Sequence, residues 1–320
     1  MSTGTPRLGT GNPLVGDGTP PLGSEPSPAG AGTTTPQAAA PAVASGPAAG
    51  PVVVASDLDR TLIYSGAALA LTMPDADAPR LLCVEVHERK PLSYMTETAA
   101  GLLARLTEDT VFVPTTTRTR KQYQRISLPG VPAAYAICAN GGHLLVDGVT
   151  DHDWHASVTA RLADECAPLA EIRAHLTAAA DPAWLRKERI AEDLFAYLVV
   201  ERQLLPDGWV KELAGWAGER GWSVSLQGRK IYVVPKPLTK SAAVHEVVRR
   251  TGARLTLAAG DSLLDADLLL AADEGWQPAH GELADAGWTA PHVEALPHRG
   301  VLAGEEILRR AGVRAARAAG

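Results

Sequence analysis

The chain has 320 residues, of which 46% are hydrophobic and 21% are charged, so it is long enough for one sizeable core and a second, smaller domain. Its formal net charge of −6 excludes the classes of protein that bind nucleic acid or an anionic membrane surface through a basic stripe. The three widely spaced cysteines include no Cys-x-x-Cys pair. They predict neither a disulfide framework nor a zinc site, and they favour a cytoplasmic location.

Residues 1–50 are rich in glycine, proline, alanine and threonine and contain no apolar run that could build a core. This composition predicts a disordered tail. A secretory signal would need a basic start followed by a continuous apolar stretch, and the tail has neither. The chain contains no segment of roughly 20 apolar residues, so we expect no membrane-spanning helix and no membrane partner.

The next part of the chain alternates short apolar runs with longer stretches of helical spacing. Continuous β-branched runs are typical of parallel strands that are buried on both faces. In chain order we predict a strand over Val52–Ser56, a helix over Thr96–Thr107, a strand over Thr110–Pro114, a helix beginning in Lys121–Ser127 and a strand over Ala133–Ala139. Such an alternation implies right-handed crossovers and a doubly wound, mostly parallel α/β sheet.

The pattern changes between residues 142 and 235. The predicted elements there are a strand over His143–Asp147, a long helix over Ala156–Ala180, a strand over Leu194–Val200, a helix over Gly208–Arg220, and strands over Trp222–Leu226 and Lys230–Val234. Two helices among antiparallel strands predict an α+β cap domain over residues 142–235. A helix over Ser241–Arg250 and a strand over Leu255–Ala259 then return to the first pattern, so the core comprises residues 51–141 and 236–315.

Polar and charged side chains follow the predicted core strands, at the edge where open α/β sheets bind ligands. They are Asp57, Asp59 and Thr61, then Thr115, Thr116, Thr117 and Arg118, then Lys240 at a helix start, and finally Asp261 and Asp265. Hydroxyl groups and a guanidinium group suit phosphate oxygens, and a lysine adds a compact positive charge. Carboxylates and backbone carbonyls are ligands for Mg²⁺, so the sequence predicts a site for phosphate and magnesium.

The motifs Asp57-x-Asp59-x-Thr61, Thr115-Thr116-x-Arg118, Lys240 and Gly260-Asp261-Ser262-x-x-Asp265 occur in an order that resembles the haloacid dehalogenase superfamily. The place of the insertion and the Asn140-Gly141 pair resemble its Cof-type and sucrose-phosphate-phosphatase-like branch, which has an α+β (C2-type) cap. The resemblance covers about residues 52–312. It implies a Rossmann-like core and a Mg²⁺-dependent phosphomonoester hydrolase. The implied substrate is a small phosphorylated metabolite, a sugar or sugar-like phosphate.

The resemblance also implies roles for single residues. Asp57 would attack phosphorus and become an aspartyl phosphate, while Asp59 would protonate the leaving oxygen and then activate water. Thr116 would bind the phosphoryl oxygens, and Lys240 would offset negative charge. The implied ligands of Mg²⁺ are Asp57, Asp59 through its carbonyl group, and Asp261, with Asp265 as a further ligand or as the partner of one. The remaining residues assigned to substrate binding are Thr61, Thr115, Thr117, Arg118, Asn140 and Arg229.

Several alternatives remain open at this level. Thr115 and Thr117 could satisfy backbone groups, Arg118 could form a surface salt bridge, and Arg229 could lie on an exposed turn. The chain departs from the family pattern by having Thr117 and Ser241 at positions that usually hold glycine. Two other functions fit the motifs, namely a phosphomutase and a non-catalytic sensor of a phosphorylated ligand. The oligomeric state is not predicted.

Overall fold

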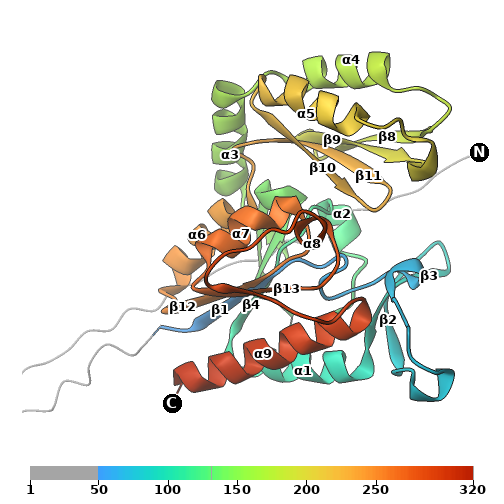
Figure 1. The fold of residues 1–320 in the computed structure, drawn as a ribbon. Coiled ribbons are helices and arrows are strands. Elements are labelled where there is room, and N and C mark those ends of the chain that lie inside the picture. Colours follow the sequence, from blue (N-terminus) through green and yellow to red (C-terminus); the bar gives the residue numbers. More distant parts are fainter. Residues whose placement is uncertain (1–49, 131, 320) are drawn as a thin grey trace, which may run out of the picture. The chain divides into compact units, whose positions relative to one another are not determined.

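The computed structural model describes residues 50–130 and 132–319, so the predicted disordered tail lies outside the described residues. A five-stranded parallel sheet stands at the centre of the core (Figure 1). Its strands, in spatial order, are β14 (Val293–Ala295), β13 (Glu274–Gln277), β12 (Leu255–Ala259), β1 (Val52–Ser56) and β4 (Val111–Pro114). All four neighbouring pairs are parallel, as the continuous apolar runs predict.

Side chains of β1 alternate between the two faces of this sheet, and every residue of the strand is buried. Val52 and Val54 pack with α1 (Glu97–Asp109) and α9 (Val301–Ala319). Val53 and Ala55 pack on the opposite face with α6 (Lys240–Thr251) and α7 (Ala266–Ala271). Helices therefore cover both faces of the sheet (Figure 1), and the predicted doubly wound fold is confirmed.

Further elements extend the core. Beyond β4, the strand β5 (Tyr135–Cys138) begins a three-stranded antiparallel sheet with β6 (His143–Val146) and β7 (Val149–Thr150). A second hairpin, β2 (Leu81–His87) and β3 (Lys90–Thr96), has no counterpart among the predicted elements. The short helices are α2 (Arg120–Tyr123) and α8 (Glu282–Asp285), with 3-10 turns at Gly66–Ala68, Asp75–Asp77, Ala139–Gly141, Arg202–Leu204 and Leu263–Asp265.

The inserted segment forms a separate four-stranded antiparallel sheet. Its spatial order is β10 (Trp222–Gln227), β11 (Lys230–Pro235), β9 (Phe195–Val200) and β8 (Leu185–Ala191). The helices of this layer are α3 (His152–Glu165), α4 (Leu169–Ala179) and α5 (Trp209–Gly218). Because β6 and β7 pair with β5, we propose that the cap begins after Thr150 instead of at residue 142.

The prediction of one long helix over Ala156–Ala180 is wrong. The structure has two helices, because the chain is extended at Cys166 and the second helix begins behind Pro168. A proline has no N–H group for the helical hydrogen-bond ladder, and its ring clashes with the preceding turn. The break lets α3 and α4 pack separately on the inserted sheet, where Val158, Ile172 and Leu176 share one apolar cluster.

Phe195 provides a test of this second core. Its side chain is fully buried in the apolar cluster of the inserted layer. We expect Phe195→Ala to lower the free energy of unfolding by about 3–5 kcal/mol, because the substitution removes buried apolar surface and leaves a cavity. Urea unfolding measures the loss. Leu204→Ala is the matched control, since Leu204 is 55% exposed, and equal losses for the two variants would contradict the assigned packing.

Candidate active site

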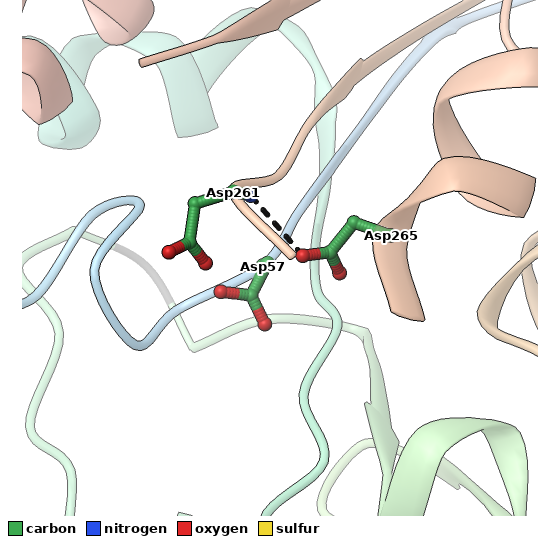
Figure 2. A group of neighbouring side chains, drawn as sticks. All are labelled: Asp57, Asp261 and Asp265. Carbon is green, nitrogen blue, oxygen red and sulfur yellow. Dashed lines mark hydrogen bonds between the residues drawn. The ribbon is translucent and has the colours of Figure 1, made fainter. Parts of the chain in front are cut away.

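Four charged residues that are far apart in the sequence meet at the carboxyl end of the central strands. Asp57 follows β1, Lys240 begins α6, and Asp261 and Asp265 follow β12. Nζ of Lys240 donates hydrogen bonds to Oδ1 of Asp57 at 2.6 Å and to Oδ1 of Asp265 at 2.5 Å. The three carboxylates place oxygen atoms within 4.8 Å of one another (Figure 2). The structure thus brings together the charged core of the site that the sequence predicts.

Asp265 holds the loop after β12 in shape. Its Oδ2 accepts hydrogen bonds from the N–H groups of Asp261 and Ser262 and from the Ser262 hydroxyl, at 3.1, 2.9 and 2.7 Å. Oδ1 accepts from Lys240, so both oxygens have partners. Gly260 makes this packing possible, because a Cβ there would lie 2.3 Å from the Cβ of Asp265.

The four residues are at most 5% exposed, so their charges act in a medium of low polarity. Three carboxylates and one ammonium group give the cluster a formal charge of −2. Burial, together with Asp265 and against the attraction of Lys240, raises the pKa of Asp57 to about 7. Burial and the neighbouring Asp57 and Asp265 raise the pKa of Asp261 well above its usual value. The cluster therefore has an excess of negative charge that a divalent cation would neutralise.

Arg118 is bound within the protein by three polar groups. Its Nε and Nη2 donate to the two carboxylate oxygens of Asp59 at 2.7 and 2.8 Å, a bidentate pair. Nη1 lies 2.8 Å from Oε2 of Glu85, and Nη2 also donates to Ser93 at 3.3 Å. Burial acts to raise the pKa of Asp59, but Arg118 outweighs it and lowers this pKa. In this structure Arg118 therefore holds Asp59 through a salt bridge, but its side chain is only 11% exposed, so the pair is not the surface salt bridge of the sequence analysis.

Sequence reasoning did not find the partners of Arg118. Glu85 and Ser93 come from the β2–β3 hairpin, and Glu85 is 2% exposed, with Arg125 as a second cation at 3.1 Å. Burial acts to raise the pKa of Glu85, but Ser93 and the two arginines lower it. The available signal was a single acidic residue within the apolar run Leu81–Val86.

The threonines divide into two groups. Thr61 donates to Oδ2 of Asp57 at 3.1 Å, so it contacts the predicted nucleophile. Thr116 is fully buried, and its Oγ1 accepts the N–H of Arg118 at 3.1 Å. In contrast, the hydroxyl of Thr115 donates to the carbonyl of Val113 at 2.9 Å, and so satisfies the backbone. Thr117 is 7% exposed.

Asn140 and Arg229 lie apart from the carboxylate cluster. The amide of Asn140 donates to the carbonyl of Leu238 at 2.7 Å and so connects the two segments that link the core to the inserted layer. Next to it Gly141 has φ +99°, and a Cβ there would lie 2.1 Å from the carbonyl oxygen of Thr239. Arg229 is exposed on the turn between β10 and β11.

Arg60 and His280 border the site and were not singled out in the sequence. Nε of Arg60 lies 3.3 Å from Oδ2 of Asp261. His280 bonds through Nε2 to the carbonyl of Arg60 at 2.7 Å, and its Nδ1 accepts the N–H of Gly300 at 3.1 Å. This arrangement assigns the proton to Nε2 and requires a neutral ring. Burial lowers the pKa of His280 to about 4.

Comparisons with known proteins were made at three levels. No protein-family model and no curated protein matches this chain. Among solved structures, the sucrose-phosphatase of Synechocystis sp., in complex with sucrose and phosphate, is 14% identical with a TM-score of 0.51, covering 82% of this chain and 98% of its own. The C-terminal domain of trehalose-6-phosphate phosphatase from C. albicans is 14% identical with a TM-score of 0.49, covering 84% and 93%.

A HAD subclass IIB sugar phosphatase is also 14% identical, with a TM-score of 0.45 and coverage of 83% and 97%. The likeness to sucrose-phosphatase concerns the fold, and it extends over both layers because it covers most of each chain. The chain shares the fold of this sucrose-phosphatase, so the fold that the resemblance implies is confirmed. In the described residues no helix is long and apolar enough to cross a membrane.

His280 makes the stability of this region depend on pH. Its pKa is about 4 in the folded chain against an ordinary 6.5, so the unfolded chain takes up the proton first as the pH falls. We expect the free energy of unfolding to decline from pH 6.5 toward pH 4, by about 2–3 kcal/mol at pH 4.5 from this residue. Urea unfolding at several pH values should show a shallower decline for His280→Gln. Parallel curves for the two proteins would show that His280 is not the source.

Proposed function

We propose that this chain is a Mg²⁺-dependent phosphomonoester hydrolase that acts on a small phosphorylated metabolite, a sugar or sugar-like phosphate. The observation that carries the proposal is the contact of buried Asp57 with Lys240, beside Asp261 and Asp265, at the carboxyl end of a central parallel strand. A sugar phosphate is supported by the similar fold of sucrose-phosphatase, which was solved with sucrose and phosphate. A cytoplasmic location remains a prediction from the sequence.

In the first step, a carboxylate oxygen of Asp57 attacks phosphorus, and the bond from phosphorus to the leaving oxygen breaks. Asp59 gives its proton to that oxygen, which leaves as an alcohol. Lys240 and Thr61 hold the two oxygens of Asp57 and so fix the direction of attack. Because Arg118 lowers the pKa of Asp59, the free site holds Asp59 ionised. The charge of the approaching phosphate raises the proton affinity of Asp59, which takes up from solvent the proton that it then gives to the leaving oxygen.

In the second step, water attacks the phosphorus of the aspartyl phosphate. Asp59 takes a proton from this water, the bond between phosphorus and Asp57 breaks, and inorganic phosphate leaves. The hydroxyl hydrogen of Thr116 is available to a phosphoryl oxygen, since Oγ1 uses its acceptor side for the N–H of Arg118. Lys240 offsets the negative charge of the transferring group.

The residues present fit Mg²⁺, which prefers hard oxygen ligands. It usually takes only a few of them from the protein, because it keeps several of its waters. A divalent cation matches the formal charge of −2 of the buried cluster of Asp57, Lys240, Asp261 and Asp265. We assign the ligand set to Asp57, Asp261 and the carbonyl of Asp59. Asp265 holds Lys240 and the loop instead, because its two oxygens already accept four hydrogen bonds, whereas those of Asp57 accept two and keep lone pairs for the ion. When bound, the ion would neutralise charge on the phosphoryl group.

Removal of the nucleophile tests the mechanism. Asp57→Asn should lower kcat for a chromogenic aryl phosphate by more than about a thousandfold, since an amide does not form the phosphoenzyme. Phosphate release is the measurement, and thermal unfolding checks that the variant is folded. Asp164→Asn, an exposed carboxylate on α3, is the control and should keep the full rate. Near-normal turnover by folded Asp57→Asn would overturn the aspartyl-phosphate route.

Binding of the metal can be measured without turnover. Mg²⁺ at 100 times its dissociation constant should stabilise the folded chain by about 2.7 kcal/mol, which appears as a higher Tm. EDTA should remove this increase and also abolish phosphate release. Asp261→Asn should lose most of the Mg²⁺-dependent increase in Tm, because it removes one of the assigned ligands. If neither the Tm nor the activity changes on addition of Mg²⁺ or EDTA, the ligand assignment is wrong.

A further inference from the structure

The inserted sheet has two chemically different faces, because neighbouring residues of a strand point to opposite sides. Helices α4 and α5 cover one face of this sheet (Figure 1). That face is apolar and buried, as at Leu198 and Ile231. Residues directly opposite each other on antiparallel strands share a face. The register therefore collects on the other face the polar residues Arg189, Tyr197, Tyr232, Lys230 and Gln227. We call these five residues the polar cap face.

Glu282 of the core makes one of the contacts with the inserted sheet. Glu282 on α8 accepts hydrogen bonds from the hydroxyl of Ser225 at 2.5 Å and from the N–H of Leu226 at 2.6 Å, both on β10. Glu282 also accepts the N–H of Leu263, in the loop that carries Asp261, at 3.2 Å. These bonds attach the end of the β10–β11 hairpin to the loop of the candidate active site.

Lys230 follows the turn of this hairpin directly. A Cβ on Gly228 in that turn would lie 3.9 Å from Nη1 of Arg60, whose Nε lies 3.3 Å from Asp261. Burial acts to raise the pKa of Asp59, and Lys230, after Arg118, is among the cations that lower it. The β10–β11 turn therefore lies beside Arg60, and the ammonium group of Lys230 lies within electrostatic reach of Asp59.

Two aromatic rings lie close to this ammonium group. Nζ of Lys230 lies 5.7 Å from the ring centre of Tyr197 and 5.8 Å from that of Tyr232. Such distances allow a cation–π attraction, which holds a flexible lysine side chain in place. Tyr232, together with Asp59, keeps the pKa of Lys230 above its ordinary value, so the group carries a full charge.

The cations on this side of the sheet have no acidic partners of their own. Within residues 50–130 and 132–319, Lys187, Arg189 and Lys230 form no ion pair. The neighbouring acid of β8, Glu188, points to the other face and pairs with Arg173 of α4 at 3.3 Å. Cations that form no direct ion pair within the protein and lie near a reaction site attract an anionic ligand.

We infer that the substrate carries a second anionic group, a carboxylate or a second phosphate, on the part that leaves, and that Lys230 binds it. The inference rests on the proposed function and names the substrate class of that site. The phosphoryl group lies at Asp57 in the core, and the leaving part extends toward the polar cap face. Arg189, on the same face beyond Tyr197, adds a second positive charge along this direction.

The test compares substrates that differ by one anionic group. Glucose 6-phosphate and 6-phosphogluconate differ by a carboxylate, and fructose 1,6-bisphosphate supplies a second phosphate instead. We expect kcat/KM to be higher for at least one of the two charged substrates than for glucose 6-phosphate. The better of the two identifies which anion the site takes. No preference for either charged substrate would overturn the inference.

Lys230→Met is the decisive variant. It should lower kcat/KM for the preferred charged substrate about 10- to 100-fold, the value of a charge-assisted hydrogen bond. Glucose 6-phosphate and p-nitrophenyl phosphate should change by less than about twofold, because they have no second anion for Lys230 to bind. Lys211→Met, a cation on α5 over the opposite face, is the matched control and should change none of them. Equal losses on all substrates would show that Lys230 acts through Asp59, and would overturn the inference.

A binding experiment separates this inference from the proposed hydrolase. Calorimetry with Asp57→Asn should show tighter binding of the preferred charged substrate than of glucose 6-phosphate, and a second change, Lys230→Met, should remove the difference. If the wild type releases no phosphate but this difference in affinity is found, the second-anion site stands and the hydrolase fails. If phosphate is released but the difference is absent, the hydrolase stands and the second-anion site fails.

Discussion

The arrangement of the core depends on one buried ammonium group, that of Lys240. It lies between the carboxylates of Asp57 and Asp265, in a place where both it and Asp265 are fully buried. Removing such charges from water costs several kcal/mol for each ion, and only close, well-aligned partners offset the cost. The chain therefore has to bring the ends of β1 and β12 and the first residue of α6 to within a few ångströms of fixed positions. The paired register of the two strands and the absence of a side chain at Gly260 meet this requirement.

Much of this arrangement of the core and the site could be predicted from the sequence, because the relevant signals are local. The continuous run Val52–Ser56 predicts a strand buried on both faces, and the polar residues behind such strands meet at one edge of a parallel sheet. That reasoning places Asp57, Lys240, Asp261 and Asp265 together without any structure. The order of the motifs then leaves fewer possible folds than composition or periodicity could.

The parts that could not be predicted depend on contacts between distant segments. Whether Arg118 faces a substrate or a carboxylate is decided by Glu85, and Glu85 comes from a hairpin whose strands carry mixed apolar and polar residues with no clear period. The amide of Asn140 was expected at the substrate, but its partner is a carbonyl group 98 residues away in the chain. In the cap, helical spacing continues across Cys166, so the spacing alone does not show the break that precedes Pro168.

The contact between Gly141 and Thr239 has a consequence for how such a chain can evolve. The segment between β5 and α6, which comprises β6, β7 and the cap, begins and ends at two points that touch, and Asn140 fastens one to the other through Leu238. A segment whose two ends are adjacent adds no strain to the host sheet, whatever its length or architecture. Lys240 is the first helical residue after the return, so it keeps its place whichever module is inserted. The reaction chemistry and the choice of substrate can then diverge independently, each by mutation of its own part of the gene.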